Sequence, residues 1–413
     1  MTLNKQPALD AIEKEQNTIL HVADEIWNYA ELSLQEFRSA KLYCEVLKQE
    51  GFRVEEGVCG IDTAFAASFG SGRPHIGILA EYDALSGLSQ QGGQLVHAER
   101  TPGGTGHGCG HNLLGAGALA AAIGVKAWLE QTGCPGTVTL YGCPGEEGGA
   151  AKAFMARDGL WKQLDAALTW HPEDCNEVIT GGSNACIQVQ YTFHGVASHA
   201  AEAPCAGRSA LDAAELTNVA VNYLREHVTS DVRIHYVYKE AGTAPNIVPD
   251  RAAVWYYVRG MSRQAIEEVY DRLVKVAKGA AMMTETELEI EFLGGCYNTM
   301  PNMYMANMTY DIMKQIPIPQ YTEEELKFAD EINKQSPKYP AMEAAGMTQP
   351  SIHSAVMDIQ HNDGYGSTDV GDAMHIVPCA QVMTATCNLC APGHSWQITA
   401  CAGMSIGYKG MLY

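Results

Sequence analysis

Four short segments of the sequence contain side chains that bind metal ions in proteins. The first, TGHGCGHN, alternates two histidines and a cysteine with glycines, and the others are PGEEGG, TWHPED and APGHSW. Cysteine thiolate, neutral imidazole and carboxylate form a suitable ligand set for zinc, and manganese is an alternative. The candidate residues are His107, Cys109, His111, Glu146, Glu147, His171 and His394.

The number of candidate ligands favours hydrolytic chemistry. Five protein ligands are one more than a tetrahedral site uses, so a bridging thiolate or carboxylate could join two ions. Two neighbouring ions are a recurrent arrangement for hydrolysis. Of the adjacent carboxylates Glu146 and Glu147, one can bind metal while the other accepts a proton from the attacking water.

Each segment also has a simpler interpretation when it is taken alone. A Glu–Glu pair is usually a solvated turn, and a histidine after a strand usually only forms a hydrogen bond. TGHGCGHN is not a phosphate loop, because neither GxGxxG nor GxxxxGK[ST] is present. Cys109 as a thiol nucleophile would have histidines only two residues away in a turn and would leave GEEGG without a role. The combination of the segments favours a metal site.

The elements predicted around these segments explain how they could meet. Helices are expected over 8–50, followed by alternating buried strands and helices. The strands are 75–80, 136–144 and 165–170, and the helices are 113–133 and 148–164. This order indicates an α/β domain whose mostly parallel sheet has helices on both faces. Ligands of such sheets bind beyond the carboxyl ends of the strands, where the four segments could come together.

The pattern changes after about residue 182. One amphipathic strand, a helix, two strands, a helix and a final strand follow, which is the order of a ferredoxin-like α+β unit. We therefore predict an inserted domain at 183–297, and a catalytic domain formed by 1–182 and 298–413.

The composition excludes several classes of function. The chain of 413 residues has 27 basic and 48 acidic residues and a formal charge of −21, which argues against binding to nucleic acid or anionic membranes. Its polar, acidic start is unlike a signal or transit peptide, and no run of eighteen apolar residues could span a bilayer. The 13 cysteines have irregular spacings and fit reduced thiols, including the single CxxC at Cys387 and Cys390. We expect a cytoplasmic protein.

The ordered motifs resemble the amidohydrolase branch of the dinuclear metallopeptidases. They are GHGCGHNLLGAGALAAA, PGEEGGAAK, WHP, GVASHAAEAPCAGRSALDA, APNIVPDRA and PGHSW, and the likeness covers nearly the whole chain. It implies two divalent metal ions, Mn²⁺ or Zn²⁺, with Glu146 as the general base. The ligands implied by the motifs are Cys109, His111, Glu147, His171 and His394.

The resemblance also implies supporting roles. His199, in the inserted domain, matches a histidine that stabilises the oxyanion and often comes from the partner protomer; alone, it would be read as a surface histidine. Asn246 and Arg259 match positions that grip the substrate carboxylate, for which the planar guanidinium is well suited. Arg259 fits a surface charge equally well. Asp83 and His107 would support metal ligands from behind.

The sequence departs from many members of this branch at two places. Asn112 stands where they have aspartate, and the chain stops at SIGYKGMLY where they continue with another helix. The predicted ligand set is unaffected by either difference.

The predicted function is that of a metal-dependent amidohydrolase acting on N-acyl or N-aroyl amino acids, with p-aminobenzoyl-glutamate as the first choice. A dipeptidase or an indole-acetyl-amino-acid hydrolase is the alternative on the same scaffold. A catalytically silent binding or regulatory subunit is the alternative from another class, and the complete ligand set argues against it. The inserted domain implies lid and dimerisation functions and a homodimer, while a hetero-oligomer with a related A subunit stays open.

Overall fold

The computed structural model describes residues 4–413, which form two compact units. The first unit comprises the chain up to Gly181 together with Pro301–Asn362 and Ala373–Tyr413. The second comprises Gly182–Met300 and Asp363–Asp372. The sequence pattern did not predict that 363–372 would group with the second unit.

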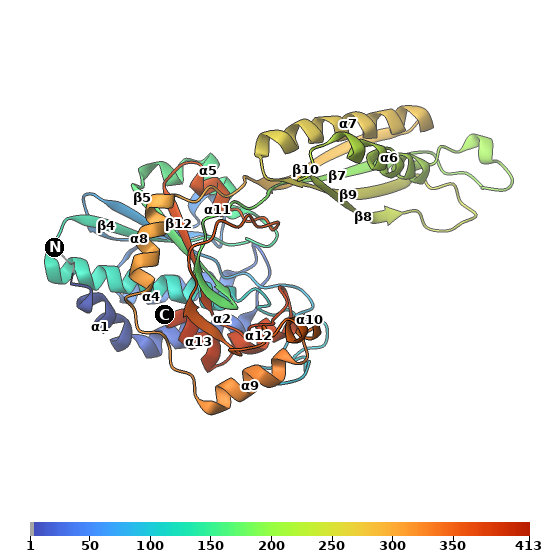
Figure 1. Ribbon diagram of the computed structural model, residues 1–413. Coiled ribbons are helices and arrows are strands. Elements are labelled where there is room, and N and C mark those ends of the chain that lie inside the picture. The colour runs from blue at the N-terminus through green and yellow to red at the C-terminus, as the bar shows by residue number, and fades with distance from the viewer. Residues whose placement is uncertain (1–3) are drawn as a thin grey trace. The chain divides into compact units, whose positions relative to one another are not determined.

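The first unit is built on an eight-stranded sheet in the order β1-β2-β4-β3-β5-β12-β6-β11 (Figure 1). The neighbours β4, β3, β5 and β12 run parallel to one another, and β1 and β2 add an antiparallel edge. The strands are β1 (Arg53–Glu56), β2 (Phe65–Ser71), β3 (His75–Ala80), β4 (Gly136–Gly142), β5 (Ala166–Glu173), β6 (Cys175–Val178), β11 (His353–Val356) and β12 (Cys379–Ala385).

The central strands agree with the sequence prediction, since β3, β4 and β5 correspond to the three expected buried strands. β4 is buried along nearly its whole length, as expected for a strand covered on both faces of the sheet. The prediction missed the other five strands. β1 reads RVEE and is mostly exposed, and β6 and β11 have only four residues each, so these strands lack an apolar signal.

The helices of the first unit include one correction. The single helix predicted over 148–164 is α5 followed by a separate 3₁₀ turn at Leu160–Gln163, because Gly159 adopts φ +80° and ends the helical run. The helices are α1 (Gln6–Lys14), α2 (Gln16–Tyr29), α3 (Phe37–Gln49), α4 (His111–Thr132), α5 (Ala151–Arg157), α8 (Met303–Met313), α9 (Glu323–Asn333), α10 (Tyr339–Ala344), α12 (Trp396–Ala402) and α13 (Ser405–Leu412), with α11 (Val370–Met374) spanning a unit boundary.

Helix α4 forms the centre of the core. It packs on β3, β4 and β5, and α1, α2 and α13 pack against it. Within residues 4–413 it is the one helix long and apolar enough to cross a membrane, which corrects the expectation that no such segment exists. However, 61% of its most apolar window is buried inside the protein, so its place in the core accounts for its composition.

Glycines allow α4 to approach its neighbours closely. A Cβ atom added at Gly115 would lie 2.2 Å from Tyr43 Oη, and one at Gly117 would lie 2.6 Å from Trp170 Cζ2. Because α4 begins at His111, this close packing also fixes the position of a candidate metal ligand.

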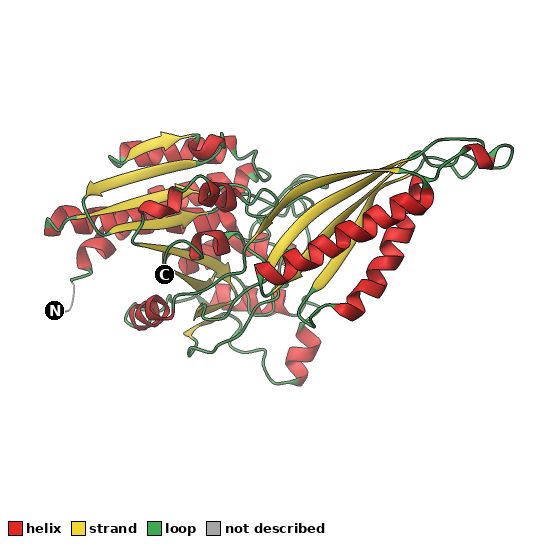
Figure 2. Cartoon of the chain, turned by 90° about the horizontal axis from the view of Figure 1, so that it is seen from above, coloured by secondary structure: helices red, strands yellow, loops and turns green. Residues whose placement is uncertain are grey.

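The second unit has the predicted β-α-β-β-α-β order. Its antiparallel sheet has the order β10-β7-β9-β8, and α6 and α7 pack on each other and on β7 and β9 (Figure 2). Ser209 and Ser262 cap the two helices by accepting backbone N–H groups of the first turn. The elements are β7 (Ala185–His194), α6 (Ala210–Leu224), β8 (Arg233–Ala241), β9 (Arg251–Gly260), α7 (Arg263–Thr284) and β10 (Glu287–Cys296).

Candidate metal centre

The carboxyl ends of the central strands deliver the polar segments to one place. Glu81 and Asp83 directly follow β3, the PGEEGG segment follows β4, and His171 lies in the second half of β5. TGHGCGHN leads into α4 through Gly110, which has φ +74° and would place a Cβ 2.8 Å from Pro172 Cβ. Glycine is therefore required at this turn, because a side chain would be strained and would clash.

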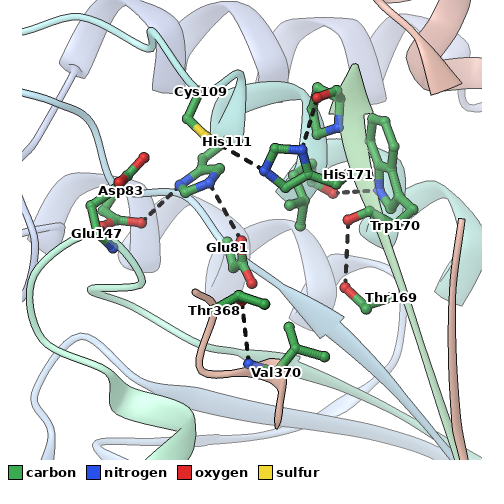
Figure 3. A network of polar contacts seen from close by, with 12 residues as sticks. Glu81, Asp83, Cys109, His111, Glu147, Thr169, Trp170, His171, Thr368 and Val370 are labelled. Carbon is green, nitrogen blue, oxygen red and sulfur yellow. Dashed lines mark hydrogen bonds and ion pairs between the residues drawn. The ribbon is translucent and has the colours of Figure 1, made fainter. Parts of the chain in front are cut away.

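The structure brings all five predicted ligands together in two overlapping groups (Figure 3). Within each group the potential ligand atoms lie within 4.8 Å of one another. Cys109 belongs to both groups, so its thiolate is in position to bridge two ions. The groups are Cys109, His111 and His171, and Cys109, Glu147 and His394.

The spacing of these atoms fits a metal ion better than hydrogen bonding. Cys109 Sγ lies 3.4 Å from His171 Nε2, and Glu147 Oε1 lies 3.4 Å from His394 Nε2. Two ligands bound tetrahedrally to one zinc ion at its usual bond lengths would be about 3.3–3.6 Å apart. Among the described residues, His111 Nε2 and Glu147 Oε1 are also buried without a hydrogen-bond partner. The donor set therefore fits divalent metal ions.

Asp83 fixes the orientation of His111. Asp83 Oδ1 lies 3.0 Å from His111 Nδ1, and Oδ2 accepts hydrogen bonds from the Ser33 hydroxyl and the Glu147 backbone N–H. Burial disfavours the charged carboxylate, but these contacts lower the pKa of Asp83 to about 2. A proton on Nδ1 leaves the Nε2 lone pair of His111 available to a metal.

Cys109 and His107 differ sharply in their surroundings. Burial raises the pKa of the Cys109 thiol well above its usual range, so the thiolate requires a metal ion to form. This environment is unlike that of a thiol nucleophile. His107 lies behind the ligands, where Nε2 contacts the Ile26 carbonyl at 2.9 Å and burial lowers its pKa to about 4. It connects the glycine-rich turn to α2.

Two residues near His111 were missed by the sequence analysis. The fully buried Lys152 in α5 lies 2.7 Å from Glu81 Oε1, and Glu81 Oε2 lies 3.4 Å from His111 Nε2. Burial opposes the charge on Glu81, but Lys152 and His111 lower its pKa below the usual value. Glu81 follows a predicted strand, so the strand-end argument applied to the other segments would have found it. Lys152 had no such signal, because a lysine in a helix is normally exposed.

A second buried carboxylate holds the PGEEGG segment. Glu36 Oε1 accepts hydrogen bonds from the backbone N–H groups of Leu34 and Gly145, and Oε2 accepts one from the Thr63 hydroxyl. Since Gly145 directly precedes Glu146 and Glu147, Glu36 anchors the start of the segment that contains both. The sequence analysis missed this residue too, although it lies in AELSLQEF.

Three predicted residues lie in the second unit. His199 is exposed, and its Nδ1 accepts hydrogen bonds from the backbone N–H groups of Ala201 and Glu202. Asn246 is exposed and its carbonyl accepts the Ala200 N–H, so it lies beside His199. Arg259 is half-buried, with Nη1 donating to the Ser367 hydroxyl at 3.2 Å. Its buried Nε has no hydrogen-bond partner within 4–413.

The CxxC cysteines are separate from the metal centre. Cys387 and Cys390 are both buried free thiols. Burial is the main cause that raises the pKa of each. They belong to none of the candidate metal-binding groups found among the described residues.

Comparison with known proteins agrees with this architecture. The model of peptidase family M20/M25/M40 matches residues 77–318. The chain is 41% identical to the B subunit of p-aminobenzoyl-glutamate hydrolase from Escherichia coli, over 98% of its own length and 88% of that protein. It is 29% identical to the Xaa-Arg dipeptidase of Mus musculus over 74% of this chain and 70% of the relative. The fold matches a Bacillus subtilis structure described as a dinuclear metal-binding peptidase, at a TM-score of 0.58 and 18% identity, covering 97% and 98% of the two chains.

Proposed function

The chain belongs to peptidase family M20/M25/M40 and is a metal-dependent amidohydrolase, and we propose that its substrates are N-acyl or N-aroyl amino acids, with p-aminobenzoyl-glutamate first. The 41% identity to one chain of a p-aminobenzoyl-glutamate hydrolase, over nearly the full length, supports this choice. The single observation that supports the chemistry is the convergence of five ligands in two groups that share Cys109.

We assign the five converging residues as ligands of two divalent ions, Mn²⁺ or Zn²⁺. When bound, the ions supply Lewis-acid polarisation of the amide carbonyl and lower the pKa of a water molecule. Glu146 lies within 4.8 Å of the ligand atoms of His111 and Glu81, and is the neighbour of the ligand Glu147. Its carboxylate accepts the proton of the attacking water and delivers it to the leaving amine.

The second unit supplies the remaining polar groups in this proposal, as a lid and dimerisation domain. Because Nδ1 of His199 accepts two backbone N–H groups, its proton belongs on Nε2, which can donate to the developing oxyanion. The partnerless Nε of Arg259 suits a substrate carboxylate, with Asn246 as a further donor.

We further propose an oligomeric enzyme of the cytoplasm. The E. coli relative is named as one subunit of its enzyme, which supports either a homodimer or a hetero-oligomer with a related A subunit. The described residues include all 13 cysteines, and each is a free thiol. Free thiols at this number fit a reducing compartment.

A substrate panel tests the proposed function. Metal-free protein is reloaded with Mn²⁺ or Zn²⁺, and kcat/KM is measured for p-aminobenzoyl-glutamate, N-acetyl-glutamate, indole-3-acetyl-aspartate and a dipeptide ending in arginine. We expect p-aminobenzoyl-glutamate to be preferred over the dipeptide at least tenfold, with no hydrolysis in metal-free protein.

Two outcomes would overturn this assignment. Preference for the arginine dipeptide would identify a dipeptidase, the activity for which the mouse relative is named. Absence of hydrolysis with both metals would indicate a catalytically silent protein with a binding or regulatory role.

A further inference from the structure

The geometry around His111 points to a ligand beyond the predicted set. Glu81 forms a third group of potential ligands with His111 and Glu146, in which the ligand atoms again lie within 4.8 Å of one another. We propose that Glu81 is an additional ligand of the metal ion that His111 binds, and that Lys152 holds the Glu81 carboxylate in place. This inference rests on the proposed metal-dependent function.

The first argument is the atom that Glu81 faces. Asp83 already contacts Nδ1 of His111, so Nε2 is the nitrogen left for metal. Glu81 Oε2 lies 3.4 Å from this Nε2, the same separation as in the Cys109–His171 and Glu147–His394 pairs (Figure 3). Since one imidazole nitrogen binds one ion, the ion on His111 also lies beside Glu81.

The second argument is that the orientation of His111 does not require Glu81. Asp83 fixes the ring through Nδ1, and the start of α4 fixes its backbone. A second carboxylate placed against the ligand nitrogen is costly to bury unless a cation lies between them. A divalent ion bound by both atoms satisfies that requirement.

The third argument is the position of Lys152. Its side chain is fully buried and its Nζ lies 2.7 Å from Glu81 Oε1, which leaves Oε2 facing His111. One oxygen is therefore fixed by an ammonium group while the other is directed toward the ligands. The charges also balance. Two divalent ions and Lys152 contribute five positive charges, and the Cys109 thiolate and the four carboxylates of Glu81, Asp83, Glu146 and Glu147 contribute five negative charges.

The assignment predicts that the two ions are bound unequally. The ion at Cys109, His111 and His171 gains Glu81 as a fourth protein ligand, whereas the ion at Cys109, Glu147 and His394 has three. A site with four protein ligands is typical of tightly held zinc, and a site with three keeps an open position for chemistry.

Metal affinity of the Glu81→Gln protein tests the inference without relying on activity. The two Zn²⁺ dissociation constants are measured by competition with a chromophoric chelator, and the ions per chain are counted by elemental analysis. We expect Glu81→Gln to weaken the tighter site at least 100-fold and to change the weaker site by less than threefold.

The control is Glu325→Gln, which alters another largely buried glutamate–lysine pair, since Lys409 Nζ lies 2.6 Å from Glu325 Oε2. This variant should keep both affinities. If Glu81→Gln does not fold, the double variant Glu81→Gln/Lys152→Met removes both charges together and is measured in its place.

The outcomes separate the inference from the proposed function. Two sites of wild-type affinity in the Glu81 variant, or an equal weakening of both sites, would overturn the assignment of Glu81. Wild-type protein that binds neither Zn²⁺ nor Mn²⁺ would instead overturn the proposed metal-dependent function.

Discussion

Asp83 connects three parts of the metal centre through a single carboxylate. It contacts the ring of His111, the hydroxyl of Ser33 and the backbone of Glu147. Because these partners come from the start of α4, the loop after α2 and the PGEEGG segment, Asp83 sets the relative positions of two ligands. Carboxylate support of this kind commonly changes metal affinity 10–100-fold when it is removed.

Glu36 should make the stability of the protein depend on pH. Burial and the negative charge of Asp83 raise the pKa of Glu36 to about 7 from its ordinary value of 4.5. Between these values the folded state keeps a proton that the unfolded chain has released, so stability falls as the pH rises. The Gln variant cannot ionise. Its free energy of unfolding relative to the wild type should rise by about 3 kcal/mol from pH 4.5 to 7.5.

Chemical unfolding of the metal-free proteins at a series of pH values measures this difference. Glu55→Gln, at an exposed position in β1, controls for the loss of a glutamate as such. Parallel stability curves for the wild type and Glu36→Gln would show that Glu36 does not titrate in this range.

The residues that the sequence analysis found and missed differ in a physical way. Cysteine, histidine and paired glutamates in glycine-rich turns are unusual enough to be recognised singly, and the structure brings Cys109, His111 and their partners together. Glu81 and Lys152 belong to common residue types, and only their burial against each other makes them notable. Burial of this kind depends on tertiary packing and is not visible in the spacing of residues.

At the scale of elements, the glycines of α4 are the most sensitive positions. A methyl group at Gly115 would collide with Tyr43 Oη and lie 2.8 Å from the Glu81 carbonyl. We expect Gly115→Ala to destabilise the protein by about 1–3 kcal/mol, as overpacking does in well-packed cores. It should also weaken metal binding, because α4 and the strand end at Glu81 must separate.

Gly279→Ala in α7 is the matched control, since a Cβ there would meet nothing within 4 Å. That variant should be as stable as the wild type or up to about 1 kcal/mol more stable, because alanine favours helix. Thermal unfolding compares the two variants. Equal midpoints for both would refute the close-packing account of α4.

The fold itself was predictable where each element has a strong pattern. The buried run HIGILA and the long uncharged helix 113–133 correspond closely to β3 and α4, and the alternating strands of the second unit are all present. The short strands β6 and β11 were missed because four residues give no periodicity. Their place in the sheet depends on pairing with distant strands, which one sequence does not reveal.

At the scale of the whole molecule, β8 is the feature that favours self-association. It is an edge strand of the second unit, and it is exposed along nearly its whole length. Val237, at 53% exposure, lies in the middle of this strand. A lysine on an edge strand opposes pairing with another strand. If β8 forms the proposed dimer interface, Val237→Lys should shift the protein from dimer to monomer.

Sedimentation equilibrium measures this shift. Phe292→Lys places the same charge on β10, the opposite edge of the sheet, at a similar exposure of 54%. That control should remain dimeric. A wild-type monomer, or a Val237→Lys protein of unchanged mass, would contradict the assignment of β8.

The central claim is that the adjacent carboxylates Glu146 and Glu147 divide the work of proton transfer and metal binding. The most direct measurement is turnover of p-aminobenzoyl-glutamate together with metal content, on the same preparations of Glu146→Gln and Glu147→Gln. We predict that Glu146→Gln keeps two ions per chain while kcat falls by about 10²–10⁴-fold, and that Glu147→Gln loses one ion. Turnover at the wild-type rate in Glu146→Gln, with both ions bound, would contradict the account.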